Sequence, residues 1–194
     1  MVELLLASQS PRRQELLASL GIPTKVLRID VDETLHDAVP PHMVAEVLAQ
    51  RKAHAFCQSD LLPHQVLVTA DTVVVHNGEV LGKPHDIEQA KQMLRSLSGE
   101  EHMVYTGVCL STMHERRHFT EATRVWFKPL SNQEIDYYVT HFQVLDKAGA
   151  YGIQQWIGMV GVSHIEGCYY NVMGLPVARI WEELTSLIDD FPVA

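Results

Sequence analysis

The sequence predicts an α/β fold in which a mixed β-sheet is flanked by helices. Short apolar runs typical of strands alternate with amphipathic helical patterns along the whole chain. A length of 194 residues without internal repeats or a low-complexity linker fits a single domain, so we expect residues 1–194 to form one domain. Because 46% of the residues are hydrophobic and 20% are charged, an intrinsically disordered chain is excluded.

The strand candidates differ in how strongly the pattern supports them. The run VLVTA at 66–70 is the best candidate for a buried strand, and VVV at 73–75 continues it after Asp71 and Thr72. Asn77-Gly78 then signals a hairpin. The remaining predicted strands cover residues 3–7, 25–31, 103–112 and 119–127.

The predicted helices have recognisable first residues, which are either N-cap side chains or prolines. The segment 131–134 (SNQE) is a capping box. The starts are predicted at Ser10-Pro11, Pro40-Pro41, Asp86, Ser131 and Pro176. Residues 149–174 contain six of the eleven glycines, and we expect this region to be rich in loops.

Charge and cysteine content exclude several classes of function. With 15 Lys+Arg against 24 Asp+Glu, the formal net charge is -9, which disfavours nucleic-acid and anionic-membrane binding. Cys57, Cys109 and Cys168 contain no CxxC pair, so a reduced cytoplasmic location is the simplest expectation. The N-terminus lacks the pattern of a signal peptide, and no run approaches the roughly 20 apolar residues of a membrane span.

The segment 8–13 (SQSPRR) has the pattern of an anion site. A strand leads through a polar turn into a helix N-terminus, which presents free N–H groups and the positive end of the helix dipole. Arg12 and Arg13 in the first turn cost about 0.3–1 kcal/mol each, and an anionic ligand would reverse that sign. The alternative is that both arginines point into solvent.

Asp71 follows the strongest strand, where a partly buried carboxylate needs a metal, a cation or several hydrogen bonds. The carboxyl end of a strand is also where α/β proteins bind ligands. The alternative is an aspartate that caps a turn. Lys52, on a helix rim, and Lys83, between Gly82 and Pro84, could each be ordinary solvated lysines. Segment 147–154 (KAGAYGIQ) permits close backbone approach, and the Gln154 amide can pair with a complementary amide edge; a tight structural loop is equally consistent.

The segment 114–118 (HERRH) matches the H-E-x-x-H pattern of zinc proteases. That motif requires a helix, on which both histidines share one face. Here it falls between two predicted strands, so we interpret it as a hairpin tip rather than a zinc site.

Taken together, these segments resemble one family. LLLASQSPRRQELLASLG, VDE, LAQRKA, VTADTVVV, NGEVLGKP, MLRSLSG and DKAGAYGIQ occur in the order and spacing of Maf-family nucleoside triphosphate pyrophosphatases, in particular the dTTP/UTP subgroup. The resemblance covers residues 4–185 and implies an elongated fold with a central cleft, similar to inosine triphosphate pyrophosphatases. It also implies hydrolysis of dTTP and UTP to the monophosphate and pyrophosphate, a divalent cation (Mg²⁺ or Mn²⁺) and a homodimer.

The resemblance also implies roles for individual residues. The catalytic carboxylate falls on Asp71, and Glu33 and Asp71 would hold the metal. The phosphate-handling turn falls on Ser8, Ser10 and Arg13. The other polar residues of the phosphate and metal site fall on Glu33, Lys52 and Lys83, and the base-selectivity positions fall on Arg12, Thr72 and Gln154.

Two other functions stay open at this stage. A nucleotide-binding regulator of cell division would use the same phosphate site, although it has no need of two carboxylates there. The second alternative is a pyrophosphatase that prefers another nucleotide, CTP or 7-methyl-GTP. The charged residues among these site positions have a net charge of +2, because four are cationic (Arg12, Arg13, Lys52 and Lys83) and two are anionic (Glu33 and Asp71). The rest of the chain carries -11.

Overall fold

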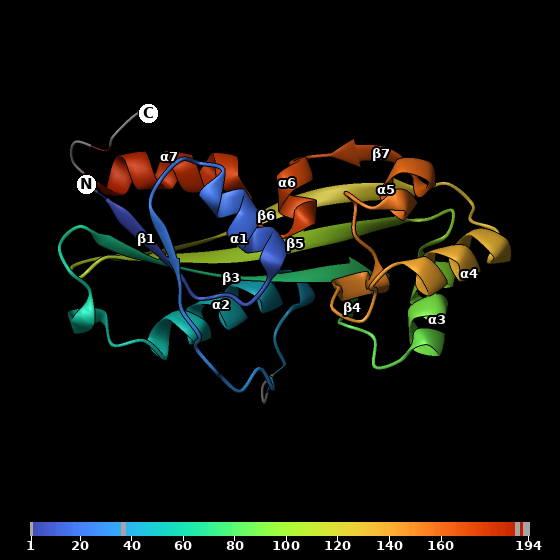
Figure 1. Cartoon of the computed structure of the whole chain (residues 1–194). Coiled ribbons are helices and arrows are strands. Elements are labelled where there is room, and N and C mark those ends of the chain that lie inside the picture. Colours follow the sequence, from blue (N-terminus) through green and yellow to red (C-terminus); the bar gives the residue numbers. More distant parts are fainter. Residues whose placement is uncertain (1, 36–37, 189–190, 192–194) are drawn as a thin grey trace. The chain divides into compact units, whose positions relative to one another are not determined.

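The computed structural model describes residues 2–35, 38–188 and 191. They form a seven-stranded sheet in the order β2-β1-β3-β5-β6-β7, with β4 paired to β3 (Figure 1). The strands are β1 Glu3–Leu6, β2 Thr24–Val26, β3 Gln65–His76, β4 Glu79–Leu81, β5 Glu101–Ser111, β6 Arg116–Phe127 and β7 Val162–Glu166. The α-helices are α1 Pro11–Ala18, α2 Val44–His54, α3 Ile87–Leu97, α4 Asn132–His141, α5 Trp156–Gly161, α6 Tyr169–Met173 and α7 Val177–Leu187.

The sheet is mixed, as predicted. β1 pairs in parallel with both β2 and β3, whereas the β3–β4 and β6–β7 pairs are antiparallel. Asn77 and Gly78 adopt φ values of 50° and 79°, which a two-residue hairpin turn of type I′ requires. The predicted α/β class with flanking helices is therefore confirmed, while the elongated shape and the central cleft stay predictions.

The chain divides into two compact units. The first unit comprises Met1–Asp71, Thr106–Glu121 and Gly174–Ala194, and the second comprises Thr72–Tyr105 and Ala122–Met173. Strands β3, β5 and β6 each contribute residues to both units. The prediction of one domain over residues 1–194 stays a prediction, and its outermost residues lie outside the described part of the chain.

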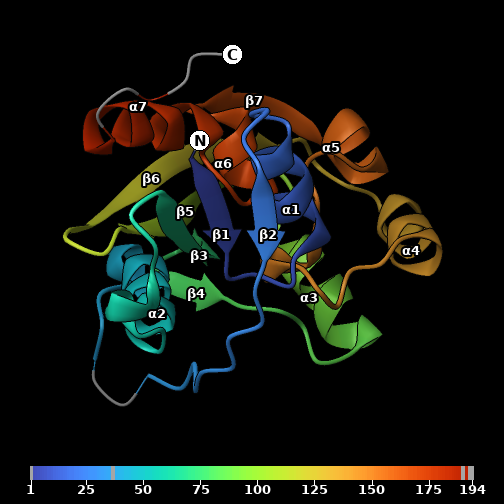
Figure 2. The same ribbon diagram turned by 60° about the vertical axis from the view of Figure 1, so that its left-hand side comes forward.

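In the first unit, helices cover both faces of the sheet, with α2 on one face and α1 and α7 on the other (Figures 1 and 2). Adjacent residues of β6 show this alternation, because neighbouring side chains on a strand point to opposite faces. On one face, the Arg179 guanidinium of α7 lies over the Phe119 ring, 4.5 Å from the ring centroid. On the other face, the Thr120 hydroxyl donates to the Glu46 carboxylate of α2 over 2.6 Å.

The second unit has its own hydrophobic core. Tyr138, Leu94 and Ile157 lie within it, and α3 packs against α4. The predicted caps are formed as expected: Asp86 accepts from the Gln89 N–H at the start of α3, and Ser131 and Glu134 form the capping box of α4.

Three predictions about elements were wrong. β2 covers only Thr24–Val26 instead of 25–31, because the sheet pairing ends where its short partner β1 ends. Asp71 lies inside the continuous strand β3 and not at a strand end, since the apolar residues on both sides of it belong to the same strand. Residues 149–174 were expected to be rich in loops, but most of them form α5, β7 and α6. Some of the glycines in this region allow close packing of these elements instead of forming turns.

Candidate functional site

One ammonium group joins two carboxylates in the first unit. Lys52 Nζ lies 2.6 Å from Asp71 Oδ1 and 2.7 Å from Glu33 Oε1. The Lys52 and Asp71 side chains are only 12% and 16% exposed, whereas Glu33 is 51% exposed. The structure thus brings together three of the residues predicted from the sequence, and it supplies the cation that the partly buried Asp71 needs.

The packing of α2 on β3 sets this geometry. The Thr69 hydroxyl, fully buried on β3, donates to the Ala49 carbonyl of α2 over 2.7 Å. Asp71 lies two residues beyond Thr69 and so faces the same side of the sheet. Lys52 lies three residues beyond Ala49, on the same face of the helix. A single buried hydrogen bond therefore places the carboxylate and the ammonium opposite each other.

Arg51 was not predicted as a site residue, although it fixes the segment that carries Glu33. Its Nη1 donates to the carbonyl oxygens of Asp32 and Thr34, over 2.7 and 2.8 Å. An arginine directly before the predicted Lys52 was the available signal, but its long-range carbonyl partners are visible only in the folded chain.

The turn before α1 gathers polar groups around Ser8. The Ser8 hydroxyl oxygen accepts from the Ser10 N–H over 3.2 Å and from Arg13 Nη1 over 3.5 Å. Ser10 occupies the N-cap position of α1, as predicted, although its side chain makes no capping hydrogen bond. The Ser8 hydroxyl takes up the Ser10 N–H, and the turn therefore forms before the helix begins.

Arg13 is held by the main chain at Gly174, to which its Nε donates over 2.8 Å. Desolvation lowers the pKa of the Arg13 guanidinium, the neighbouring Arg12 lowers it further, and Asp71 and Glu33 act in the opposite direction. Arg12, Arg13 and both carboxylates thus share one electrostatic environment, in which a polyphosphate would relieve the repulsion between the two arginines.

Three predicted residues belong to the second unit. Thr72 follows Asp71 on β3 and is half-buried, and Lys83 is exposed just after β4. Gln154 lies in a turn before α5, and its Oε1 is buried without a hydrogen-bond partner among the described residues. A buried acceptor without a donor is costly, and none of the described residues supplies the missing donor.

The segment 114–118 lies at the β5–β6 turn and the start of β6, so the hairpin interpretation is confirmed. His118 Nδ1 lies 2.8 Å from Glu46 Oε1 of α2 instead of facing His114 on a helix. Within residues 2–35, 38–188 and 191, no group of three or more His, Cys, Asp or Glu side chains is arranged to hold a metal ion.

Two carboxylates alone still fit a divalent cation that is bound together with its substrate. Mg²⁺ commonly takes one or two protein carboxylates and completes its octahedron with phosphate oxygens and water. Glu33 and Asp71 already converge on a single positive group, the Lys52 ammonium. Their oxygen donors are the type that Mg²⁺ and Mn²⁺ prefer.

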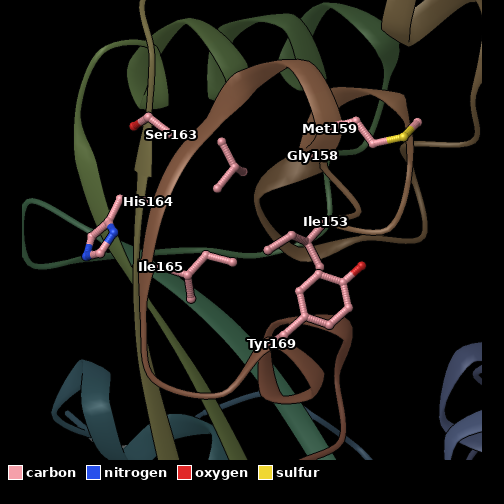
Figure 3. A pocket seen from close by; sticks show the side chains of 8 residues that line it. Ile153, Gly158, Met159, Ser163, His164, Ile165 and Tyr169 are labelled. Atoms are coloured by element: carbon pink, nitrogen blue, oxygen red, sulfur yellow. The ribbon is translucent and has the colours of Figure 1, made fainter.

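A separate pocket of about 480 Å³ opens on the second unit. Ile153, Ile165 and Tyr169 contribute to its largely apolar lining (Figure 3). None of its lining residues is a predicted site residue, so we assign it no part in the chemistry. In the described part of the chain, no helix is long and apolar enough to cross a membrane.

Comparisons with known proteins agree over nearly the whole chain. The family model described as Maf-like protein matches residues 3–187. The dTTP/UTP pyrophosphatases of Phocaeicola vulgatus and Bacteroides fragilis are 47% and 48% identical to it over 186 residues, covering 95% of this chain and 96% of each relative. The dTTP/UTP pyrophosphatase of Porphyromonas gingivalis is 46% identical, covering 94% of this chain and 92% of that relative.

Among solved structures, the Ham1 protein of Staphylococcus aureus is 16% identical, covering 64% of this chain and 71% of that one, with a TM-score of 0.46. The assignment rests instead on the sequence relatives and on the family match, which includes every predicted site residue from Ser8 to Gln154. This chain belongs to the Maf family.

Proposed function

We propose that this Maf-family chain hydrolyses dTTP and UTP to the nucleoside monophosphate and pyrophosphate. The relative from Bacteroides fragilis, which carries the name dTTP/UTP pyrophosphatase, is 48% identical to it over 95% of the chain. The observation that carries the proposal is the Lys52 ammonium held between Glu33 and Asp71. Cationic and anionic groups adjoin there, as binding a metal-chelated polyphosphate requires.

The phosphates are bound by the turn before α1 and by cationic side chains. Ser8, Ser10 and the first turn of α1 offer hydroxyl and N–H donors, and Arg13 supplies a guanidinium. Lys52 and Lys83 contribute point charges. These groups stabilise the charge that builds up on the departing pyrophosphate, and such positioning and electrostatics supply most of the acceleration in phosphoryl chemistry.

Asp71 acts as the general base. A water molecule attacks the α-phosphorus, its proton passes to the Asp71 carboxylate, and the bond from the α-phosphorus to the bridging oxygen breaks, releasing pyrophosphate. Lys52, 2.6 Å from Asp71 Oδ1, orients the carboxylate through a charge-assisted hydrogen bond. Mg²⁺ or Mn²⁺, held by Glu33 and Asp71, supplies charge neutralisation when bound.

Gln154 recognises the pyrimidine base through its side-chain amide. Its unpaired Oε1 accepts the N3–H of uracil or thymine, and its amide N–H donates to O4 of the same base. Cytosine presents the reverse pattern at these two positions. Arg12 and Thr72 are further base-selectivity residues under this proposal. The 5-methyl group does not enter the amide pairing, which accounts for a preference that includes both dTTP and UTP.

We further propose that the chain acts in the cytoplasm as a homodimer and binds no nucleic acid. The absence of a CxxC pair and the net charge of -9 support the location and the lack of nucleic-acid binding. The dimer rests on the family resemblance. Light scattering after size exclusion tests it: a mass near twice 21.9 kDa is expected, and a monomer at all concentrations would contradict it.

An assay with a panel of nucleoside triphosphates and Mg²⁺ or Mn²⁺ tests the function. We expect pyrophosphate, without orthophosphate, from dTTP and UTP, and little product without the metal. Orthophosphate alone would indicate a phosphatase, and preferred turnover of CTP or 7-methyl-GTP would correct the base assignment. Nucleotide binding without any product would favour a regulator.

Asp71→Asn tests the general base. We expect turnover of dTTP to fall by at least about a hundredfold, because general-base catalysis contributes about 10²–10⁴-fold. Asp136→Asn is the matched control, since Asp136 is also paired with a lysine, Lys91, at 2.8 Å. Both variants should keep the wild-type circular dichroism spectrum. Near-normal turnover by Asp71→Asn would show that another group takes the proton.

A further inference from the structure

The turn that carries Gln154 is tied at both ends by one buried hydroxyl group. The Gln155 N–H donates to the Gly152 carbonyl over 2.9 Å, which closes a β-turn with Ile153 and Gln154 at its centre. Tyr138 Oη of α4 accepts the Gly152 N–H over 3.0 Å and donates to Gln155 Oε1. Tyr138 therefore holds the first and the last residue of the turn.

Two glycines allow this turn to pack without a gap. A Cβ at Gly152 would lie 2.9 Å from Gln155 Oε1 and 3.2 Å from Gln154 Oε1, so both amide oxygens lie close to its backbone. A Cβ at Gly158 of α5 would lie 1.8 Å from the Ile153 carbonyl oxygen. Real Cβ contacts are never that short, so α5 closes against the turn only because residue 158 has no side chain.

We infer that Tyr138 and Gln155 are positioning residues that set the base selectivity by fixing the orientation of the Gln154 amide. This inference rests on the proposed function. The Gln154 amide could pair with cytosine if it turned end for end, so selectivity requires that its Oε1 stay presented to the imide N–H. Neither positioning residue touches the base under this inference. Both act through the turn, because their hydrogen bonds fix the backbone that carries the Gln154 side chain.

The test compares pyrophosphate release from UTP and CTP by wild type, Tyr138→Phe, Gln155→Met and the double variant. Tyr138→Phe keeps the buried ring and removes only the hydroxyl, so it breaks the side-chain hydrogen bonds to Gly152 and Gln155 while the backbone bond that closes the turn stays. We expect the UTP-to-CTP ratio of kcat/KM to fall about tenfold, a change of the size that one hydrogen bond contributes. The loss should appear as a higher KM for UTP with kcat within about twofold, because the phosphate-binding residues are untouched.

Gln155→Met removes the acceptor of the Tyr138 hydroxyl and should also lower the ratio. The double variant should lose little more than Tyr138→Phe, because Tyr138→Phe already breaks that hydrogen bond. The matched control is Tyr151→Phe. Tyr151 is buried in the same core, and its hydroxyl lies 2.7 Å from His102 Nε2 rather than at the turn. This variant should lower the thermal midpoint as Tyr138→Phe does while keeping the wild-type UTP-to-CTP ratio.

The inference would be overturned if wild type is active and the single variants keep its UTP-to-CTP ratio, or if Tyr151→Phe changes the ratio as strongly. Gln155→Met carries the test by itself if Tyr138→Phe does not fold. Failure of the proposed function gives a different result, since wild type would then release no pyrophosphate from either nucleotide.

Discussion

Two adjacent residues of α2, Arg51 and Lys52, make different kinds of contact at the candidate site. Lys52 binds the carboxylates of Glu33 and Asp71, whereas Arg51 binds the main chain on both sides of Glu33. Glu33 is half exposed, so its pairing with Lys52 contributes little stability by itself. The Arg51 hydrogen bonds instead order the segment, so that Glu33 meets its partner with less loss of entropy.

Replacing Arg51 by methionine should therefore act through Glu33. We expect kcat/KM for dTTP to fall about tenfold, because charge-assisted hydrogen bonds each contribute about 1.5–3 kcal/mol and these are partly screened by solvent. Glu33→Gln in the Arg51→Met background should add little. The control is Arg95→Met, which removes an arginine on α3 whose Nε bonds to Asn132. Independent, additive effects of the Arg51 and Glu33 changes would refute the coupling.

His102 makes the stability of the second unit sensitive to acid. Its ring is buried against Phe127 and Tyr151, and desolvation lowers its pKa from 6.5 to about 3, with a smaller contribution from His76. The folded protein therefore keeps His102 neutral, whereas the unfolded chain takes up a proton below pH 6.5. Stability is fully present above that pH and declines as the pH falls toward 3.

Urea unfolding at pH 7 and pH 5 checks this expectation. For one group the loss approaches about 1.4 kcal/mol per pH unit below the unfolded pKa, so we expect a loss of about 2 kcal/mol at pH 5. A His102→Phe variant should lose that much less between the two pH values, whatever its stability at pH 7. Equal pH dependence in both proteins would show that other groups account for the acid sensitivity.

At the level of elements, α2 lies unusually close to the sheet. A Cβ at Gly107 of β5 would lie 2.3 Å from the Cα of Glu46, and this neighbour is helix backbone that cannot rotate away. Since α2 also carries Lys52, the missing side chain at position 107 determines how near the helix can bring its ammonium to Asp71. The glycine thus links sheet packing to the candidate site.

Gly107→Ala should displace α2. We expect a loss of about 2–4 kcal/mol in unfolding free energy from the overpacked contact, together with a clear drop in kcat/KM. Gly82→Ala is the control, because a Cβ there meets no atom within 4 Å. Chemical unfolding and steady-state kinetics on both variants decide the matter. If Gly107→Ala is destabilised but keeps wild-type kinetics, the close packing of α2 on the sheet does not determine the activity of the site.

The sequence predicted local features well and distant partners poorly. The capping box at Ser131, the Asn77-Gly78 turn and the apolar run of β3 are local signals, and the structure confirms each of them. The end of β2 depends on the length of its partner strand, which no local pattern contains. Spacing and resemblance together identified Asp71 and Lys52, whereas Arg51 and Tyr138 act on segments many residues away and looked like ordinary helix positions.

For the whole molecule, charge is unevenly divided between the predicted site residues and the rest of the chain, as +2 against -11. Binding of a metal-chelated triphosphate then depends on whether the attraction by the cationic site residues or the repulsion by the acidic rest of the chain is stronger. Added salt screens exposed charges over a Debye length of about 10 Å at 0.1 M, and it weakens attraction and repulsion alike. The sign of the salt effect therefore reports which of the two dominates.

We expect the local cations to dominate. Raising KCl from about 0.05 to about 0.3 M at fixed free Mg²⁺ should raise the KM for dTTP severalfold and change kcat little. An uncharged solute such as sucrose at matched viscosity serves as the control. A KM that falls with salt would mean that the acidic remainder of the chain repels the substrate more strongly than the site attracts it.

The division into units has a consequence for how the chain acquires its structure during synthesis. The first unit is assembled from three stretches, the last of which begins at Gly174 and contains α7. Residues of the second unit are translated between these stretches. The ribosome therefore makes Lys52 and Asp71 early, while the stretch that supplies the Gly174 carbonyl to Arg13 emerges late. Completion of the contacts around the turn before α1 is consequently a late event in the synthesis of the chain, delayed by its long-range partner.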